Sequence, residues 1–106
     1  MRYRIMRLIV MFDLPVETSI EQRGYRQFRK ALLSEGFLMM QESIYVRVVT
    51  NQKAANLLEK RIKAFVPKAG LIQTLQVTEK QYASIHFLVG EPKNDIKNRD
   101  DKVIVI

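Results

Sequence analysis

The 106-residue sequence has no cysteine and no tryptophan, and it has a single histidine. Without cysteine the chain can form neither a disulfide framework nor a thiolate metal site, so carboxylates are the main metal ligands that it offers. The absence of cysteine also fits a reducing compartment, and we expect a cytoplasmic protein. The first apolar run, Leu8–Phe12, is five residues long, which is too short for a membrane span or a signal peptide. We therefore expect no membrane-spanning segment and no membrane partner.

Acidic residues are few relative to basic ones. The chain has 11 Asp and Glu against 18 Lys and Arg, which gives a formal net charge of +7 at pH 7. In a small domain this surplus indicates a polyanionic partner, and nucleic acid is the first candidate. The charge alone leaves open a ribosome-like or membrane-surface role, or a basic surface that serves only solubility.

The order of apolar and polar stretches predicts a single α+β domain. Leu8–Phe12 has a β-branched centre and runs into Asp13 and Pro15, which is typical of a buried strand that ends there. After it we expect a helix over about 20–34, strands over 37–41 and 43–49, a helix over about 52–66 and a strand over 71–78. This order predicts a ferredoxin-like βαββαβ sandwich in residues 1–78, with both helices on one face of a four-stranded antiparallel sheet.

Local signals predict where these elements begin and end. Ser19 with Gln22 three residues later has the pattern of a capping box for the first helix. Pro67 is expected to end the second helix. Between the two middle strands we expect a tight turn or bulge around Glu42.

Residues 79–106 form a C-terminal extension of this core. We expect a short helical turn at 79–82, extended chain at 84–89, a polar loop and then the β-branched run Val103–Ile106. Such a run would promote aggregation if it stayed unpaired, and the four-stranded sheet is already complete at Thr78. We expect this last strand to pair with the sheet of a second copy in a two-fold homodimer. Pairing with its own sheet is the alternative.

Asp13 is the first candidate for chemistry, because it stands at the end of a central strand, where functional sites on sheets often lie. A simpler interpretation is that Asp13 caps the turn before the helix, since Asp-x-Pro turns are common. One carboxylate is a poor ligand set for Mg²⁺ or Mn²⁺, although Mg²⁺ keeps several waters. Two copies of Asp13 that face each other across a dimer axis could share one ion. No second acid is evident as a base.

Basic residues gather on one side of the first expected helix. Arg23, Arg26 and Lys30 follow helical spacing and lie opposite its apolar face. They could bind phosphates in a sequence-independent and salt-sensitive manner. A solvated helix face explains them equally well.

Two motifs carry a resemblance to a known family. Val10–Pro15 (VMFDLP) resembles a first-strand motif that ends in aspartate, and Gln41–Tyr45 (QESIY) resembles a Gln-x-Ser-apolar-aromatic motif at the second strand pair. Their order and spacing, together with the chain length and the strand-rich tail, resemble the CRISPR-associated protein two family. This family is the small nuclease-type subunit of CRISPR adaptation. The stretch 38–40 and the tail from Gly90 are more similar to members from single-protein-effector, type II-like systems.

The resemblance implies a ferredoxin-like homodimer that binds duplex DNA together with the CRISPR-associated integrase subunit during spacer acquisition. It also implies a metal-dependent phosphodiesterase (endonuclease) activity on RNA or DNA. The catalytic and metal-binding residue of the family corresponds to Asp13, and the serine of the second motif corresponds to Ser43 in a supporting role. Arg23 and Arg26 are candidates for its arginines.

Two other interpretations stay open. The protein could be a non-catalytic structural bridge that holds DNA between integrase subunits. It could also be an unrelated basic ferredoxin-like module that binds RNA, although aromatic stacking motifs on the central strands are missing.

Overall fold

The computed structural model describes residues 5–91, which form one sheet and three helices. The elements are β1 (Met6–Asp13), α1 (Ser19–Ser34), β2 (Leu38–Gln41), β3 (Ile44–Val49), α2 (Gln52–Lys63), β4 (Leu71–Thr78) and α3 (Glu79–Ala83). The strands lie in the order β2-β3-β1-β4, and every neighbouring pair is antiparallel. The predicted α+β architecture is therefore confirmed, and its topology is consistent with the ferredoxin-like fold. The homodimer stays a prediction, and the strand expected at 103–106 lies outside the described residues.

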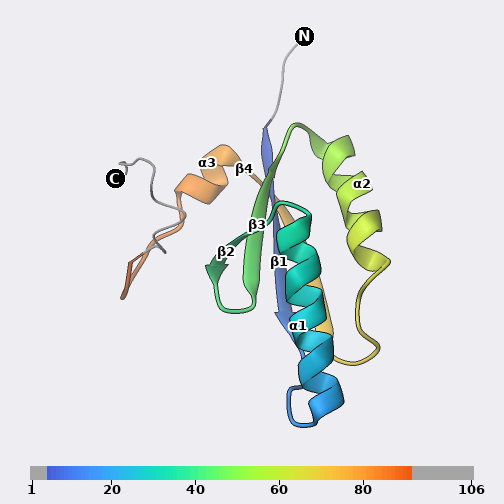
Figure 1. Ribbon diagram of the computed structural model, residues 1–106. Helices are drawn as coiled ribbons and strands as arrows, with labels where there is room; N and C mark the ends of the chain where they lie inside the picture. Colours follow the sequence, from blue (N-terminus) through green and yellow to red (C-terminus); the bar gives the residue numbers. More distant parts are fainter. Residues whose placement is uncertain (1–4, 92–106) are drawn as a thin grey trace.

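The core lies between the sheet and the two long helices, α1 and α2, which cover the same face (Figure 1). Alternate residues of β1 point toward these helices, so Leu8 and Val10 are fully buried. They pack in one apolar cluster with Phe28 of α1 and Leu58 of α2. The central position of β1, between β3 and β4, explains why its sequence is an almost continuous apolar run.

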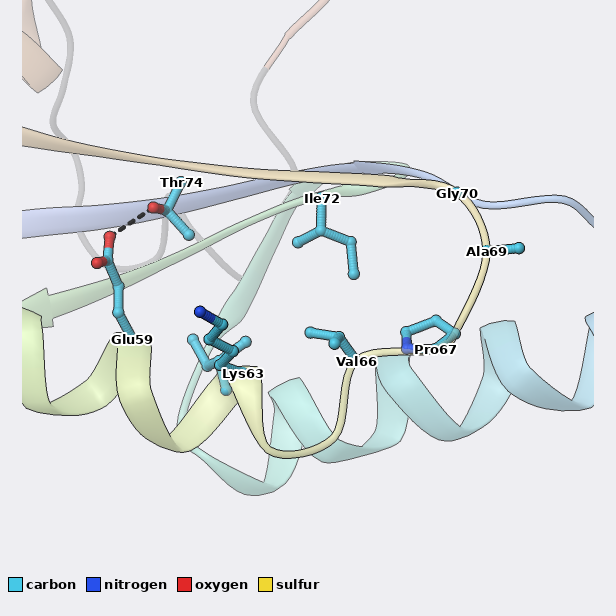
Figure 2. A pocket seen from close by; sticks show the side chains of 9 residues that line it. Glu59, Lys63, Val66, Pro67, Ala69, Gly70, Ile72 and Thr74 are labelled. Carbon is cyan, nitrogen blue, oxygen red and sulfur yellow. Dashed lines mark hydrogen bonds between the residues drawn. The ribbon is translucent and has the colours of Figure 1, made fainter.

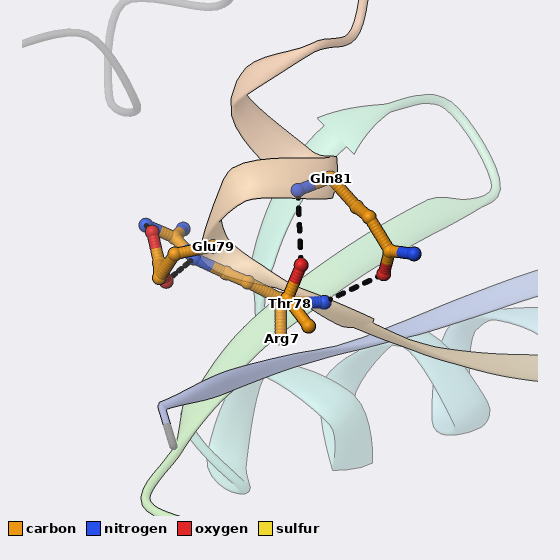
Figure 3. Close-up of polar contacts among 4 residues, drawn as sticks. All are labelled: Arg7, Thr78, Glu79 and Gln81. Carbon is orange, nitrogen blue, oxygen red and sulfur yellow. Dashed lines mark hydrogen bonds and ion pairs between the residues drawn. The ribbon is translucent and has the colours of Figure 1, made fainter. Parts of the chain in front are cut away.

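The other face of the sheet is only partly covered within residues 5–91. Here α3 lies on the side opposite to α1 and α2, near the start of β1 (Figure 1). The Arg7 guanidinium forms an ion pair with Glu79, and a capping box between Thr78 and Gln81 begins the helix (Figure 3). Exposed apolar side chains remain on this face of the sheet. They are Leu38, Val48, Leu71 and Leu75, each about half exposed, and we call them the open apolar face.

The capping box predicted from Ser19 and Gln22 is wrong by one residue. Thr18 is the cap: its hydroxyl accepts a hydrogen bond from the Glu21 backbone N–H at 3.1 Å. The Glu21 carboxylate in turn accepts one from the Thr18 N–H at 3.0 Å. A carboxylate is a stronger acceptor than an amide and is favoured near the positive end of the helix dipole, so Glu21 is preferred over Gln22.

The predicted end of the second helix is also corrected. α2 ends at Lys63 rather than Val66, because Ala64 and Phe65 donate to carbonyls three residues back and tighten the last turn. The residue before Pro67 also disfavours the helical region. Residues 84–89, expected as extended chain, belong to no helix or strand, and Leu88 and Val89 are both 92% exposed.

Candidate active site

Asp13 is the last residue of β1, and its side chain is exposed. It pairs in register with Leu71, the first residue of β4. The helix that follows is capped by Thr18, so α1 does not need Asp13 as its cap. The simpler interpretation, in which Asp13 caps the turn before the helix, stays open.

Asp13 lines a shallow cavity of about 240 Å³ together with residues from two other parts of the chain. Glu42 and Ser43 come from the turn between β2 and β3, and Leu71 and Gln73 come from β4. The two motif residues Asp13 and Ser43, which lie 30 positions apart in the sequence, are thus brought to one place. Their catalytic and supporting roles stay predictions.

Glu42 is a cavity residue that sequence reasoning missed. The sequence offered no evident second acid, yet the Glu42 side chain is exposed and lines the same cavity as Asp13. The signal that could have found it is the expected bulge. The β2–β3 register does shift between Met39 and Gln41, and this shift places the turn at residues 42–43 beside the end of β1.

The turn itself has an unusual backbone. Ser43 has φ of 68°, the left-handed region that side-chain-bearing residues rarely adopt. Its carbonyl accepts a hydrogen bond from the Phe12 backbone N–H at 3.0 Å, which ties the turn to β1 one residue before Asp13. The Ser43 Oγ lies 3.4 Å from the Tyr25 hydroxyl of α1.

Gly70, just before β4, lies close to the backbone of Asp13 and to Leu14. Its φ is +107°, and a Cβ added there would lie 2.6 Å from Leu14 Cδ2 and 2.9 Å from the Asp13 carbonyl oxygen. Only glycine satisfies both the conformation and the close approach. The backbone at Asp13 is therefore positioned by a residue far away in sequence.

The predicted phosphate-binding residues lie elsewhere. Arg23, Arg26 and Lys30 are exposed on α1, as expected, but none of them lines the Asp13 cavity. Arg61 of α2 is another exposed cation, but its guanidinium forms an ion pair with Glu35 at 2.6 Å, so its charge is partly neutralised. The structure thus separates a basic helix surface from the acidic cavity.

A larger cavity of about 360 Å³ lies between α2, the loop before β4 and the sheet (Figure 2). Its polar lining includes Glu59, Lys63 and Thr74, and the Glu59 carboxylate accepts a hydrogen bond from the Thr74 hydroxyl. The rest of the lining is mainly apolar, with Ile62 and Ile72. This cavity contains none of the residues that the motifs single out, and it has one acid where the Asp13 cavity has two.

The charged ligands that the Asp13 cavity offers are the carboxylate oxygens of Asp13 and Glu42, the kind that Mg²⁺ and Mn²⁺ prefer. Within residues 5–91 there is no group of three or more His, Cys, Asp or Glu placed to hold a metal ion. The donor set of one chain therefore fits such an ion only in part, and water or a second chain must complete it. None of the helices over the same span is long and apolar enough to cross a membrane.

Comparison with known proteins identifies the family. The family model described as CRISPR associated protein Cas2 matches residues 6–85, a span that includes β1, the β2–β3 turn and β4. The chain belongs to the Cas2 family. This confirms the predicted membership, and it rules out the interpretation as an unrelated RNA-binding module.

Relatives in the Cas2 family match nearly the whole chain. A protein of Lacticaseibacillus rhamnosus is 54% identical over 95% of this chain and 100% of its own length. One from Ligilactobacillus salivarius is 50% identical over the same shares, and one from Streptococcus mutans is 45% identical over 95% of this chain and 93% of its own. All three are named CRISPR-associated endoribonuclease Cas2.

Proposed function

We propose that this Cas2-family protein is a homodimeric, metal-dependent endonuclease that hydrolyses phosphodiester bonds of RNA or DNA. In the same proposal it binds duplex DNA with the CRISPR-associated integrase subunit during spacer acquisition. The observation that carries the catalytic part is the exposed Asp13 carboxylate in a cavity shared with Glu42 and Ser43. The names of the relatives support the reaction type.

The chemistry follows from the residues of the cavity. Mg²⁺ or Mn²⁺, when bound, supplies charge that polarises a phosphate and lowers the pKa of a water. Asp13 would hold this ion, and the Glu42 carboxylate in the same cavity lining would favour cations over anions there. Ser43 supports the turn that carries Glu42. The cavity is shallow and open, so a phosphodiester of a long chain can reach it from outside.

Self-association would complete the donor set. The open apolar face contains Leu71, the residue that pairs with Asp13, so a second copy seated there would come close to the acid. Exposed apolar patches of this kind are typical of interfaces. Phe87, Leu88 and Val89 add further exposed apolar surface after α3. A two-fold axis near Leu71 would bring two Asp13 carboxylates together.

Nucleic-acid binding is assigned to α1. Arg23, Arg26 and Lys30 are exposed at helical spacing, and such cations bind the phosphate backbone without reading sequence. Each released counterion contributes to a steep dependence of affinity on salt. Charge reversal at these three positions should reduce the slope of log affinity against log salt concentration by about 2 to 3. An unchanged slope would move the DNA-binding surface away from α1.

Substitution of Asp13 is the decisive test of catalysis. Purified Asp13→Asn should lose Mn²⁺- or Mg²⁺-dependent cleavage of labelled RNA and DNA oligonucleotides, while it keeps its dimeric state and its DNA affinity. Glu17→Gln removes an exposed acid outside the cavity and serves as the matched control. Equal cleavage by Asp13→Asn and the wild type would trace the activity to a contaminant.

A second function, a non-catalytic DNA-binding bridge between integrase subunits, is favoured by the incomplete metal ligand set within residues 5–91. It predicts that Asp13→Asn supports spacer acquisition in cells as well as the wild type does. The nuclease proposal concerns the purified protein, so the two measurements separate the functions.

A further inference from the structure

Tyr25 of α1 contacts two residues that line the Asp13 cavity, Phe12 and Ser43. Its ring lies edge-on against Phe12, with 5.7 Å between ring centroids, and Phe12 directly precedes Asp13. Its hydroxyl lies 3.4 Å from Ser43 Oγ, within hydrogen-bond distance. Tyr25 itself does not line the cavity, so any influence on chemistry must act through these neighbours.

The Glu42–Ser43 turn needs such support. Ser43 is the only non-glycine residue with positive φ among those described, and this conformation is disfavoured unless the surroundings hold it. One restraint is the hydrogen bond from the Phe12 N–H to the Ser43 carbonyl. The second is the contact between the Ser43 side chain and Tyr25, which reaches the turn from a different element.

We propose that Tyr25 is a positioning residue that holds the Glu42–Ser43 turn in register with Asp13. The proposal deepens the nuclease function above and depends on it for its kinetic test. It also gives Ser43 a concrete part: its hydroxyl anchors the turn to α1 by pairing with Tyr25. Because Arg23 and Arg26 belong to the same helix, this contact also fixes the basic surface relative to the cavity.

The test uses variants that remove single hydroxyls from the full-length protein. Tyr25→Phe keeps the ring against Phe12 and loses only the contact with Ser43, and Ser43→Ala removes the other partner. Each should lower kcat for Mn²⁺-dependent cleavage of a labelled single-stranded RNA by about tenfold, because small misplacements of reacting groups are costly. KM, the salt dependence of DNA binding and the melting temperature should stay close to the wild type.

The double variant decides whether the two hydroxyls act as a unit. Tyr25→Phe with Ser43→Ala should be no slower than either single variant, since one contact can be lost only once. Tyr82→Phe, a tyrosine of α3 at the other end of β1, is the matched control and should leave kcat unchanged. The proposal would be overturned if the double variant lowered kcat by the product of the two single effects. It would also be overturned if kcat fell only in variants whose melting temperature fell.

Hydrogen exchange separates failure of this inference from failure of the nuclease proposal. Tyr25→Phe should speed amide exchange at residues 42–44, whether or not the protein cleaves nucleic acid. Unchanged exchange there overturns the inference. A different outcome is faster exchange in Tyr25→Phe together with equal cleavage by Asp13→Asn and the wild type. That outcome overturns the nuclease proposal, and the contact then has no role in catalysis.

Discussion

The two ends of β1 are built in opposite ways. At its start, Arg7 donates to the Glu79 carboxylate at 2.6 Å and lies over the Tyr82 ring, with 4.2 Å from Cζ to the ring centroid. At its last residue, Asp13 is exposed and lines a cavity with a second acid, Glu42. The charge of Arg7 is balanced by the Glu79 carboxylate and the Tyr82 ring. Asp13, by contrast, lines a cavity that has no Lys or Arg among the described residues of its lining.

Under the proposed nuclease function, this difference means that stability and chemistry are separated along one strand. The Arg7 end attaches α3 to the sheet through ionic and aromatic contacts. The Asp13 end concentrates features that cost stability, namely the left-handed Ser43 and the tight approach of Gly70. Functional sites commonly contain such locally unfavourable choices. Substitutions at the two ends should therefore affect different measurements.

The largest expected effect is on cleavage, at Asp13. Asp13→Asn should reduce metal-dependent cleavage by about a hundredfold or more, since the ion loses a charged ligand. Thermal unfolding should change little, because the side chain is exposed. A large change in melting temperature would show that Asp13 has a structural role and would break the contrast between the two ends.

The next largest effect is expected at Gly70, where substitution should lower both stability and cleavage. Gly70→Ala should destabilise the protein by about 3 kcal/mol, because alanine is strained at φ of +107° and its Cβ would meet the Asp13 backbone. Cleavage should also fall, because the rim that carries Asp13 must shift. Denaturant unfolding and cleavage assays measure the two parts. Gly90→Ala is a matched control: its φ is +89°, but a Cβ there meets nothing within 4 Å.

A smaller effect, on stability alone, is expected at Arg7. Arg7→Met removes the ion pair and the contact with the Tyr82 ring, and it should cost about 1 kcal/mol after allowance for the half-exposed Glu79. Cleavage at the far end of β1 should be retained. Denaturant unfolding with a parallel cleavage assay checks both expectations. Loss of cleavage without loss of stability would mean that the two ends are coupled.

The smallest effect is expected at Tyr82, on how the free energy of unfolding changes with pH above about pH 10. Burial raises the pKa of Tyr82 above its ordinary value of about 10, and the nearby Arg7 lowers it by less. The neutral phenol is therefore favoured in the folded state, so its contribution is complete below about pH 10 and is lost as pH rises through the folded pKa. Tyr82→Phe should reduce the slope of stability against pH in this window. Some slope should remain, because burial also raises the pKa of Tyr45.

Much of the fold could be predicted from local sequence. The apolar run of β1 and the β-branched residues of β3 predicted the strands, and the bounds Leu71–Thr78 of β4 are as expected. Errors occurred where adjacent residues compete for the same role, as Thr18 and Ser19 do for the cap of α1. That choice depends on hydrogen-bond geometry rather than on residue type.

The candidate site was less accessible to sequence reasoning. Asp13 was identified because it ends the central strand, and Ser43 because its motif resembles that of a family. Glu42 was missed because its proximity to Asp13 depends on the register of the β1–β3 pair and on a bulge. The constraint on Gly70 could not be predicted from local sequence, since its close neighbours Leu14 and Asp13 are 56 and 57 positions away.

β1 is hydrogen bonded to β3 on one side and to β4 on the other. Asp13 itself pairs with Leu71 of β4, and the Phe12 N–H just before it donates to the Ser43 carbonyl, so strand contacts hold this backbone. Of the other residues that line the cavity, Glu42 and Ser43 belong to a turn. Exchanges of residues in this turn can reshape the cavity while the Asp13 backbone stays in place. Under the proposed nuclease function, the architecture would thus allow substrate choice to change through this turn while the metal-binding acid is kept.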